Sequence, residues 1–152
     1  MSRIIVLDSG PLGLLANPRL TPLTQRAGIW FNRLQAGGDE IIIPEIADYE
    51  VRRDLIRIEA APSLIRLDEL HNQATYAALT TAAMRKAADL WARVRQQGRI
   101  TADPHVLDGD VILAAQASFL GDPATPVIIA TTNVKHLILF ADARLWQDIE
   151  PL

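Results

Sequence analysis

Asp8 is the first residue whose type and position suggest chemistry. It directly follows the apolar run 4–7, which predicts a buried strand ending in a turn at Asp-Ser-Gly-Pro. A carboxylate at the end of a buried strand costs free energy unless it is paired, caps a helix or binds a metal ion. The alternative is an Asx turn with Ser9 and Gly10. We favour the functional interpretation.

The second candidate is Glu50, in a helix predicted from Pro44 to about Ala60 and closed by Pro62. At about 100° per residue, Glu50 lies on the inward, largely apolar face. The opposite, polar sector contains Glu45, Asp48, Arg52 and Glu59.

Two alternatives to a functional Glu50 stay open in this helix. Asp54 shares the face of Glu50 one turn later, so the helical pattern leaves it as a rival. A structural ion pair of Glu50 with Arg53 or Arg57 would use the same residues.

The third candidate lies at the start of a helix predicted over residues 108–120. Asp108 is the better placed N-cap. Asp110 then occupies the first turn and projects toward the strand ends. The competing interpretation is that both acids only satisfy free helix amides.

Three carboxylates from distant segments would repel one another without a cation. An all-oxygen set suits Mg²⁺ or Mn²⁺, so we predict a metal site formed by Asp8, Glu50 and Asp110. Thr131 and Asn133, which follow the last strand, can add neutral oxygen ligands or hold a water. The three histidines lack zinc-ligand spacing and are interpreted as ordinary surface or partly buried residues: His71, His105 and His136.

The elements that must position these residues alternate along the chain. Buried strands are predicted at 4–7, 41–43, 64–67 and 127–130. Helices are predicted at 21–34, 44–60, 74–97 and 108–120, with Thr21 as an N-cap and Gly98 as a terminator. Apolar strands alternating with helices predict an α/β fold with a parallel sheet covered on both faces, a three-layer α/β/α sandwich spanning residues 1–152 as one domain. Ligands in such sheets bind beyond the carboxyl ends of the strands.

Composition narrows the class of protein. The 152 residues are 49% hydrophobic and contain no cysteine, which excludes disulfide scaffolds, cysteine-ligated metals and thiol nucleophiles and favours a cytoplasmic location. Neither a signal sequence nor an apolar stretch long enough for a membrane span is expected. The net charge of −3 gives no overall attraction for nucleic acid, but thirteen of the fifteen cations are arginine, which suits phosphate. Motifs for a P-loop, a dinucleotide fold and a GxSxG nucleophile are absent.

Four stretches together resemble the PIN-domain family, of the type found as the VapC toxin of VapBC toxin-antitoxin pairs. They are IIVLDSGPLGLL, IPEIADYEVRRDLIR, LDGDVILAAQA and VIIATTNVKHL, in the order of the family. The resemblance implies a PIN-like fold, with Asp8, Glu50 and Asp110 as the metal-binding acids. It favours Glu50 over Asp54, and it places Asn133 where the family often has a fourth acid or an asparagine.

The implied activity is that of a Mg²⁺- or Mn²⁺-dependent endoribonuclease that hydrolyses RNA phosphodiesters and leaves a 5′-phosphate. Arg53, Arg57 and the run from Arg93 to Arg99 are candidates to hold the RNA backbone. An antitoxin partner is implied, and the apolar N-terminal half is compatible with a homodimer.

The alternative function is a catalytically inactive PIN-like module that binds RNA or protein. Its support is the uncharged Asn133 and the presence of His136 where many members of the family have an aspartate.

Overall fold

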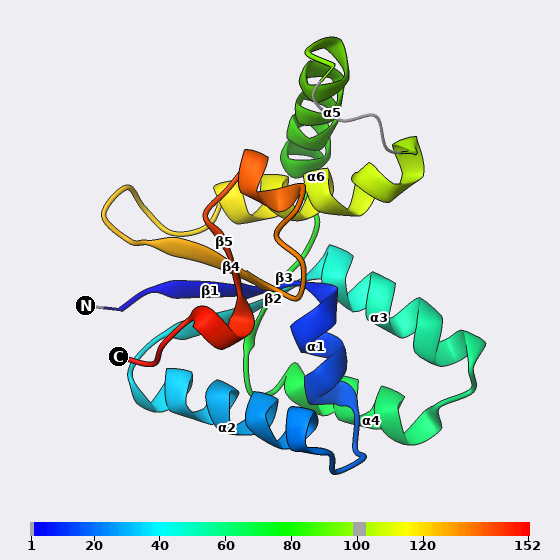
Figure 1. The fold of residues 1–152 in the computed structure, drawn as a ribbon, viewed down its shortest axis with the longest axis vertical. Coiled ribbons are helices and arrows are strands. Elements are labelled where there is room, and N and C mark those ends of the chain that lie inside the picture. The colour runs from blue at the N-terminus through cyan, green and yellow to red at the C-terminus, as the bar shows by residue number, and fades with distance from the viewer. Residues whose placement is uncertain (1, 99–102) are drawn as a thin grey trace.

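The computed structural model describes residues 2–98 and 103–152, and its centre is a parallel five-stranded sheet (Figure 1). The strand order is β3-β2-β1-β4-β5, so β1 is the middle strand. The strands are β1 (Ile4–Leu7), β2 (Glu40–Pro44), β3 (Thr75–Ala77), β4 (Val127–Thr131) and β5 (Ala143–Leu145). The predicted strands at 4–7, 41–43 and 127–130 are confirmed.

The middle of the sheet is buried on both faces because β1 and most of β2 and β4 are apolar. Alternate side chains point to opposite faces. Ile5, Ile43 and Ile128 belong to one core cluster, whereas Val6 and Ile42 belong to the cluster on the other face. The three-layer α/β/α arrangement expected from the sequence is therefore confirmed.

Helices cover each face of the sheet (Figure 1). One face packs against α1 (Ser9–Ala16), α2 (Pro22–Ala36), α3 (Glu45–Arg57) and α4 (Ala61–Leu70). The other face packs against α6 (Pro104–Ser118) and the short helix η1 (Leu137–Leu139). Helix α5 (Thr81–Gln96) packs on α6 and extends away from the sheet. The chain ends with η2 (Trp146–Asp148). No described helix is long and apolar enough to cross a membrane.

Local capping chemistry explains the best-predicted helix. The Thr21 hydroxyl accepts a hydrogen bond from the Thr24 amide, the Thr24 hydroxyl accepts one from the Thr21 amide, and Pro22 occupies the first turn. The helix ends at Gly37, next to Gly38, whose φ of 95° favours glycine.

The predicted strand at 64–67 is wrong, because that segment lies within α4. Pro62 stands in the first turn of α4, so it begins a helix instead of closing α3, which ends at Arg57. The third strand is β3, which occupies the start of the predicted helix 74–97. Strand β5 has no counterpart in the prediction.

One expected turn is part of a helix, and the predicted start of a further helix is wrong. The expected turn at Asp8-Ser9-Gly10 is the first turn of α1. Helix α6 begins four residues before Asp108, with Asp103 as its N-cap. Asp108 is therefore not the cap, and Asp110 is not in the first turn. Both errors arise because an aspartate followed by Ser or Gly is typical of turns as well as of helix starts.

Candidate active site

Asp8 lies at the carboxyl end of the central strand, where it is the N-cap of α1. Its Oδ1 accepts a hydrogen bond from the Ser9 amide at 2.7 Å, and its Oδ2 accepts one from the Thr131 hydroxyl at 2.7 Å. The chain reaches Thr131 at the end of β4, the neighbouring strand. Two adjacent strand ends therefore fix both oxygens of Asp8.

Glu50 lies on α3 and points toward α6. Its side chain is 25% exposed, whereas the side chain of its rival Asp54 is 65% exposed. A Cβ atom at Gly109 of α6 would lie 2.8 Å from Glu50 Oε2, so the carboxylate sits directly against the α6 backbone. Burial thus favours Glu50 over Asp54, which helical spacing alone could not do.

Asp110 lies on the same helix as Gly109, one residue later. His136 Nδ1, from the loop after β4, is 3.3 Å from Asp110 Oδ2. The side chain of Asp110 is 29% exposed and that of His136 is 13% exposed. Asp110 is thus held at the edge of the sheet by a residue that the sequence interpretation treated as ordinary.

Electrostatics show that the three acids share one site. Burial and the nearby charge of Asp8 raise the pKa of Glu50 to about 7, with Asp110 adding to the rise and Arg53 opposing it. Burial and the charge of Asp8 also raise the pKa of Asp110, against the opposing effect of His136. These carboxylates therefore lack full neutralisation by protein cations.

This arrangement fits a hard divalent cation in donor chemistry and charge. Carboxylate oxygens are preferred ligands of Mg²⁺ and Mn²⁺, and a cation would offset the burial and the repulsion that together raise the pKa values of Glu50 and Asp110. Each acid already has another partner: Thr131 for Asp8, Arg53 for Glu50 and His136 for Asp110. As the side chains stand, no group of three or more His, Cys, Asp or Glu in residues 2–98 and 103–152 has metal-binding geometry. Metal binding therefore requires these side chains to move from the positions that the structure shows.

The two neutral candidates at the end of β4 differ in position. Thr131 is buried and contacts Asp8 directly. Asn133 is exposed, and its Oδ1 accepts a hydrogen bond from the Lys135 amide. The structure therefore brings Thr131 to the acids, whereas the side chain of Asn133 forms a local turn.

The candidate phosphate-binding arginines lie on the exposed side of α3. Arg53 Nη2 is 3.9 Å from Glu50 Oε2, and the Arg53 guanidinium lies 5.1 Å from the centre of the Tyr49 ring. The ion pair weighed as an alternative role for Glu50 is thus present, although it is long and Arg53 is 54% exposed. Arg57 lies farther along the helix and pairs with Asp54 at 3.6 Å. Of the later arginine run, Arg99 lies outside the described residues.

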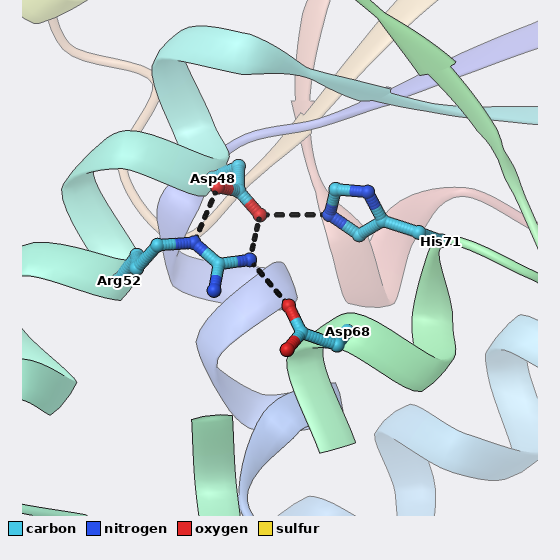
Figure 2. A network of polar contacts seen from close by, with 4 residues as sticks. All are labelled: Asp48, Arg52, Asp68 and His71. Atoms are coloured by element: carbon cyan, nitrogen blue, oxygen red, sulfur yellow. Dashed lines mark hydrogen bonds and ion pairs between the residues drawn. The ribbon is translucent and has the colours of Figure 1, made fainter. Parts of the chain in front are cut away.

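A second polar cluster lies on the other side of α3 (Figure 2). Arg52 donates to Asp48 at 2.9 and 3.1 Å and to Asp68 of α4 at 2.7 Å. His71 Nε2 is 2.8 Å from Asp48 Oδ1, and the His71 ring stacks on Tyr76. The helical pattern assigned Asp48 to a polar sector, but it is buried, because α4 and the segment after it cover that side of α3. Glu45 is likewise engaged, accepting a hydrogen bond from the Leu79 amide.

Sequence reasoning missed two residues of the site. Gly109 allows α6 to approach Glu50, and a glycine between two aspartates in a helix was the available signal, since glycine is unfavourable there. His136 belongs to the candidate site because it contacts Asp110. In the sequence, only the position of His136 after β4 indicated this.

The comparisons with known proteins identify the fold. No protein-family model matches the chain, and no curated protein matches its sequence. Three solved structures are similar. VapBC2 from Rickettsia felis, bound to a DNA fragment from its promoter, is 14% identical with a TM-score of 0.67, covering 94% of this chain and 98% of that one. VapBC-1 from nontypeable Haemophilus influenzae is 17% identical with a TM-score of 0.66, covering 95% and 99%. FitAcB from Neisseria gonorrhoeae is 14% identical with a TM-score of 0.63, also covering 95% and 99%. The likeness extends over nearly the whole of each chain.

Proposed function

We propose that this chain, which has the PIN-like α/β/α fold, is a Mg²⁺- or Mn²⁺-dependent endoribonuclease and the toxin of a toxin-antitoxin pair. One observation carries the catalytic part: burial, together with the nearby charges of Asp8 and Asp110, raises the pKa of Glu50 to about 7. Structural acids are normally paired so that their ionised form is favoured. Raised pKa values in a cluster at strand ends instead support a functional site.

The metal ion would be held by Asp8, Glu50 and Asp110. When bound, it supplies positive charge for a phosphate oxygen and lowers the pKa of an attacking water. The Ser9 amide and the Thr131 hydroxyl fix the Asp8 carboxylate in one orientation.

Substrate binding is assigned to the exposed end of the site. Arg53 is solvent-accessible and close to Glu50, so its guanidinium can bind a phosphate next to the acids. Arg57 can bind the RNA backbone one turn farther along α3, and Thr131 lies at the same edge through its contact with Asp8.

Cleavage of single-stranded RNA by the purified chain tests the proposal. We expect cleavage with Mn²⁺ or Mg²⁺ that stops with EDTA and that leaves 5′-phosphate ends. Asp8→Asn should be inactive, whereas the control Asp108→Asn, an exposed aspartate two residues before Asp110, should retain full activity. Activity that is unchanged by chelator or by Asp8→Asn would refute the nuclease. RNA binding without any cleavage would favour the inactive binding module instead.

The antitoxin partner is proposed from the similarity of the fold to the VapBC2 and VapBC-1 structures. A small reading frame next to that of the chain, whose product co-purifies with it and suppresses RNA cleavage, is the expected finding. A homodimer is also proposed, because the helices that cover the first face of the sheet expose large apolar side chains, including Ile29, Ile56 and Ile65. Light scattering would measure its mass.

A further inference from the structure

A pocket of about 290 Å³ opens between α1 and α3, next to the acid cluster. Ser9 and Glu50 line both the pocket and the acid site, so the two are continuous. Gly13, Arg53 and Asp54 also line it. An RNA chain with one phosphate at the acids would therefore place a neighbouring nucleotide at this pocket.

Gly13 leaves room for the pocket. A Cβ atom at Gly13 would have no heavy atom within 4 Å, so nothing in the described structure requires a glycine there for packing. Gly10, one turn earlier on α1, differs, because a Cβ there would lie 2.5 Å from the Thr132 hydroxyl. Glycine in the middle of a helix lowers stability relative to alanine. The missing side chain at Gly13 thus keeps open space between α1 and α3.

The rim of the pocket carries a flat cationic and aromatic surface. Arg53 lies over the Tyr49 ring, and both side chains are more than half exposed. Unstacked RNA bases bind by stacking on aromatic rings and guanidinium planes.

Asp54 supplies the hydrogen-bond acceptors of the pocket. Its side chain is 65% exposed and has a long contact, 3.6 Å, with Arg57, so the carboxylate oxygens are accessible. An ionised carboxylate accepts hydrogen bonds and donates none. It therefore complements a base edge with two adjacent N–H donors, which among the RNA bases is the N1–H and N2–H₂ edge of guanine.

We propose that this pocket is a base subsite that selects an unpaired guanine beside the cleaved phosphate. In it Asp54 accepts hydrogen bonds from guanine N1 and N2, Arg53 faces the O6 acceptor or stacks on the ring, and the gap at Gly13 admits the base. The substrate role rests on the proposed ribonuclease function, but the base-binding chemistry does not.

Two measurements test the subsite. The first is cleavage of single-stranded oligonucleotides that differ at one position beside the cleaved bond, for the wild type, Asp54→Asn and Gly13→Leu. Gly28→Leu is the matched control, because Gly28 is also a helix glycine whose Cβ would meet nothing within 4 Å. We expect the wild type to prefer guanine over uracil by about tenfold, and Asp54→Asn to lose most of this preference. Gly13→Leu should raise KM about tenfold with little change in kcat, while Gly28→Leu matches the wild type.

The second measurement is binding of uncharged guanosine and uridine to the metal-free protein, followed by NMR. Guanosine should bind more tightly than uridine, and both Gly13→Leu and Asp54→Asn should weaken guanosine binding. Equal binding of the two nucleosides, or an unchanged base preference in Asp54→Asn, overturns the subsite. Absence of RNA cleavage by the wild type with Mn²⁺ overturns the proposed function instead, and guanosine binding then decides the subsite alone. If Gly13→Leu does not fold, Asp54→Asn still tests the guanine subsite, because Asp54 is exposed.

Discussion

Helix α3 carries two acids with opposite surroundings, Asp48 on the α4 side and Glu50 on the α6 side. Burial raises the pKa of Asp48, but hydrogen bonds and charge from Arg52 and His71 outweigh it, so the pKa is lowered. Burial raises the pKa of Glu50 as well, and there the charge of Asp8 adds to it, so the pKa reaches about 7.

The contrast separates acids that stabilise the fold from acids available for a ligand. The Asp48 cluster contains its own cations and connects α3 to α4 (Figure 2). The Glu50 cluster has too little positive charge of its own, so an external cation would complete it. Residues two positions apart in sequence therefore have opposite pKa shifts because different helices cover them.

The largest expected effect is on RNA cleavage, and it tests the proposed role of the Glu50 cluster. Glu50→Gln and Asp110→Asn should each lower RNA cleavage by about 100-fold or more, because each removes a charge that would hold the metal ion. Glu59→Gln, an exposed substitution next to α3, should have no effect. Equal losses in Glu50→Gln and Glu59→Gln would show that the assignment of Glu50 is wrong.

Thermal melts with and without Mn²⁺ test the same contrast without activity. Mn²⁺ at a hundredfold excess over Kd should stabilise the wild type by about 2.7 kcal/mol. In Asp110→Asn this gain should vanish, while the metal-free protein melts at the same temperature or higher, since one repulsive charge is gone. A clear drop in the melting temperature of metal-free Asp110→Asn, with no Mn²⁺ shift in the wild type, would instead indicate a structural role.

Replacing Arg52, the cation at the centre of the Asp48 cluster, tests whether that cluster stabilises the fold. Arg52→Ala leaves the buried Asp48 without its main partner and should lower the free energy of unfolding by about 2 kcal/mol. The matched control Arg57→Ala removes an exposed pair with Asp54 and should cost less than about 0.5 kcal/mol. Urea unfolding measures both. Cleavage per folded molecule should stay normal in Arg52→Ala, and its loss would contradict the separation of the two clusters.

The smallest expected effect is a difference in pH dependence. The folded-state pKa of Glu50 lies above its ordinary value of 4.5, so without metal its destabilising effect is absent below pH 4.5, grows toward pH 7 and is complete above it. Glu50→Gln should therefore gain about 1 kcal/mol relative to the wild type between pH 5 and 7.5, after allowance for solvent screening.

Asp48 should behave in the opposite way. Its folded-state pKa is lowered, so its stabilising effect is complete above its ordinary value of 3.8 and is lost as the pH falls through the lowered value. Urea titrations in EDTA at several pH values check both signs. If Glu50→Gln and Asp48→Asn changed the free energy of unfolding with the same pH dependence, the proposed difference between the two acids would be wrong.

The sequence was sufficient where local chemistry decides structure. The apolar run before Asp8 predicted β1 closely, and Thr21 as an N-cap predicted the start of α2. By contrast, β3 and β5 have three residues each and exposed side chains, so no apolar run marks them. Their pairing with β2 and β4 makes them strands.

The sequence indicated the candidate acids but not their contacts. Strand-end position and helical phase indicated Asp8 and Glu50 before the fold was known. The contact of Glu50 with the backbone at Gly109, and that of Asp110 with His136, depend on how α6 packs against α3 and η1. The burial of Asp48 depends in the same way on α4. A helical projection treats each helix alone and cannot show such contacts.

The attachment of α5 has a consequence for hydrogen exchange. Helix α5 contributes Ala87 and Val94 to a small cluster that it shares with α6, apart from the two clusters on the sheet. A helix attached through a small cluster of this kind opens at a lower free energy than the whole fold. Amide protons of α5 should therefore exchange with solvent well before those of β1, by openings that expose Val111, the neighbour of Asp110, while Asp8 stays in place on the slowest-exchanging strand.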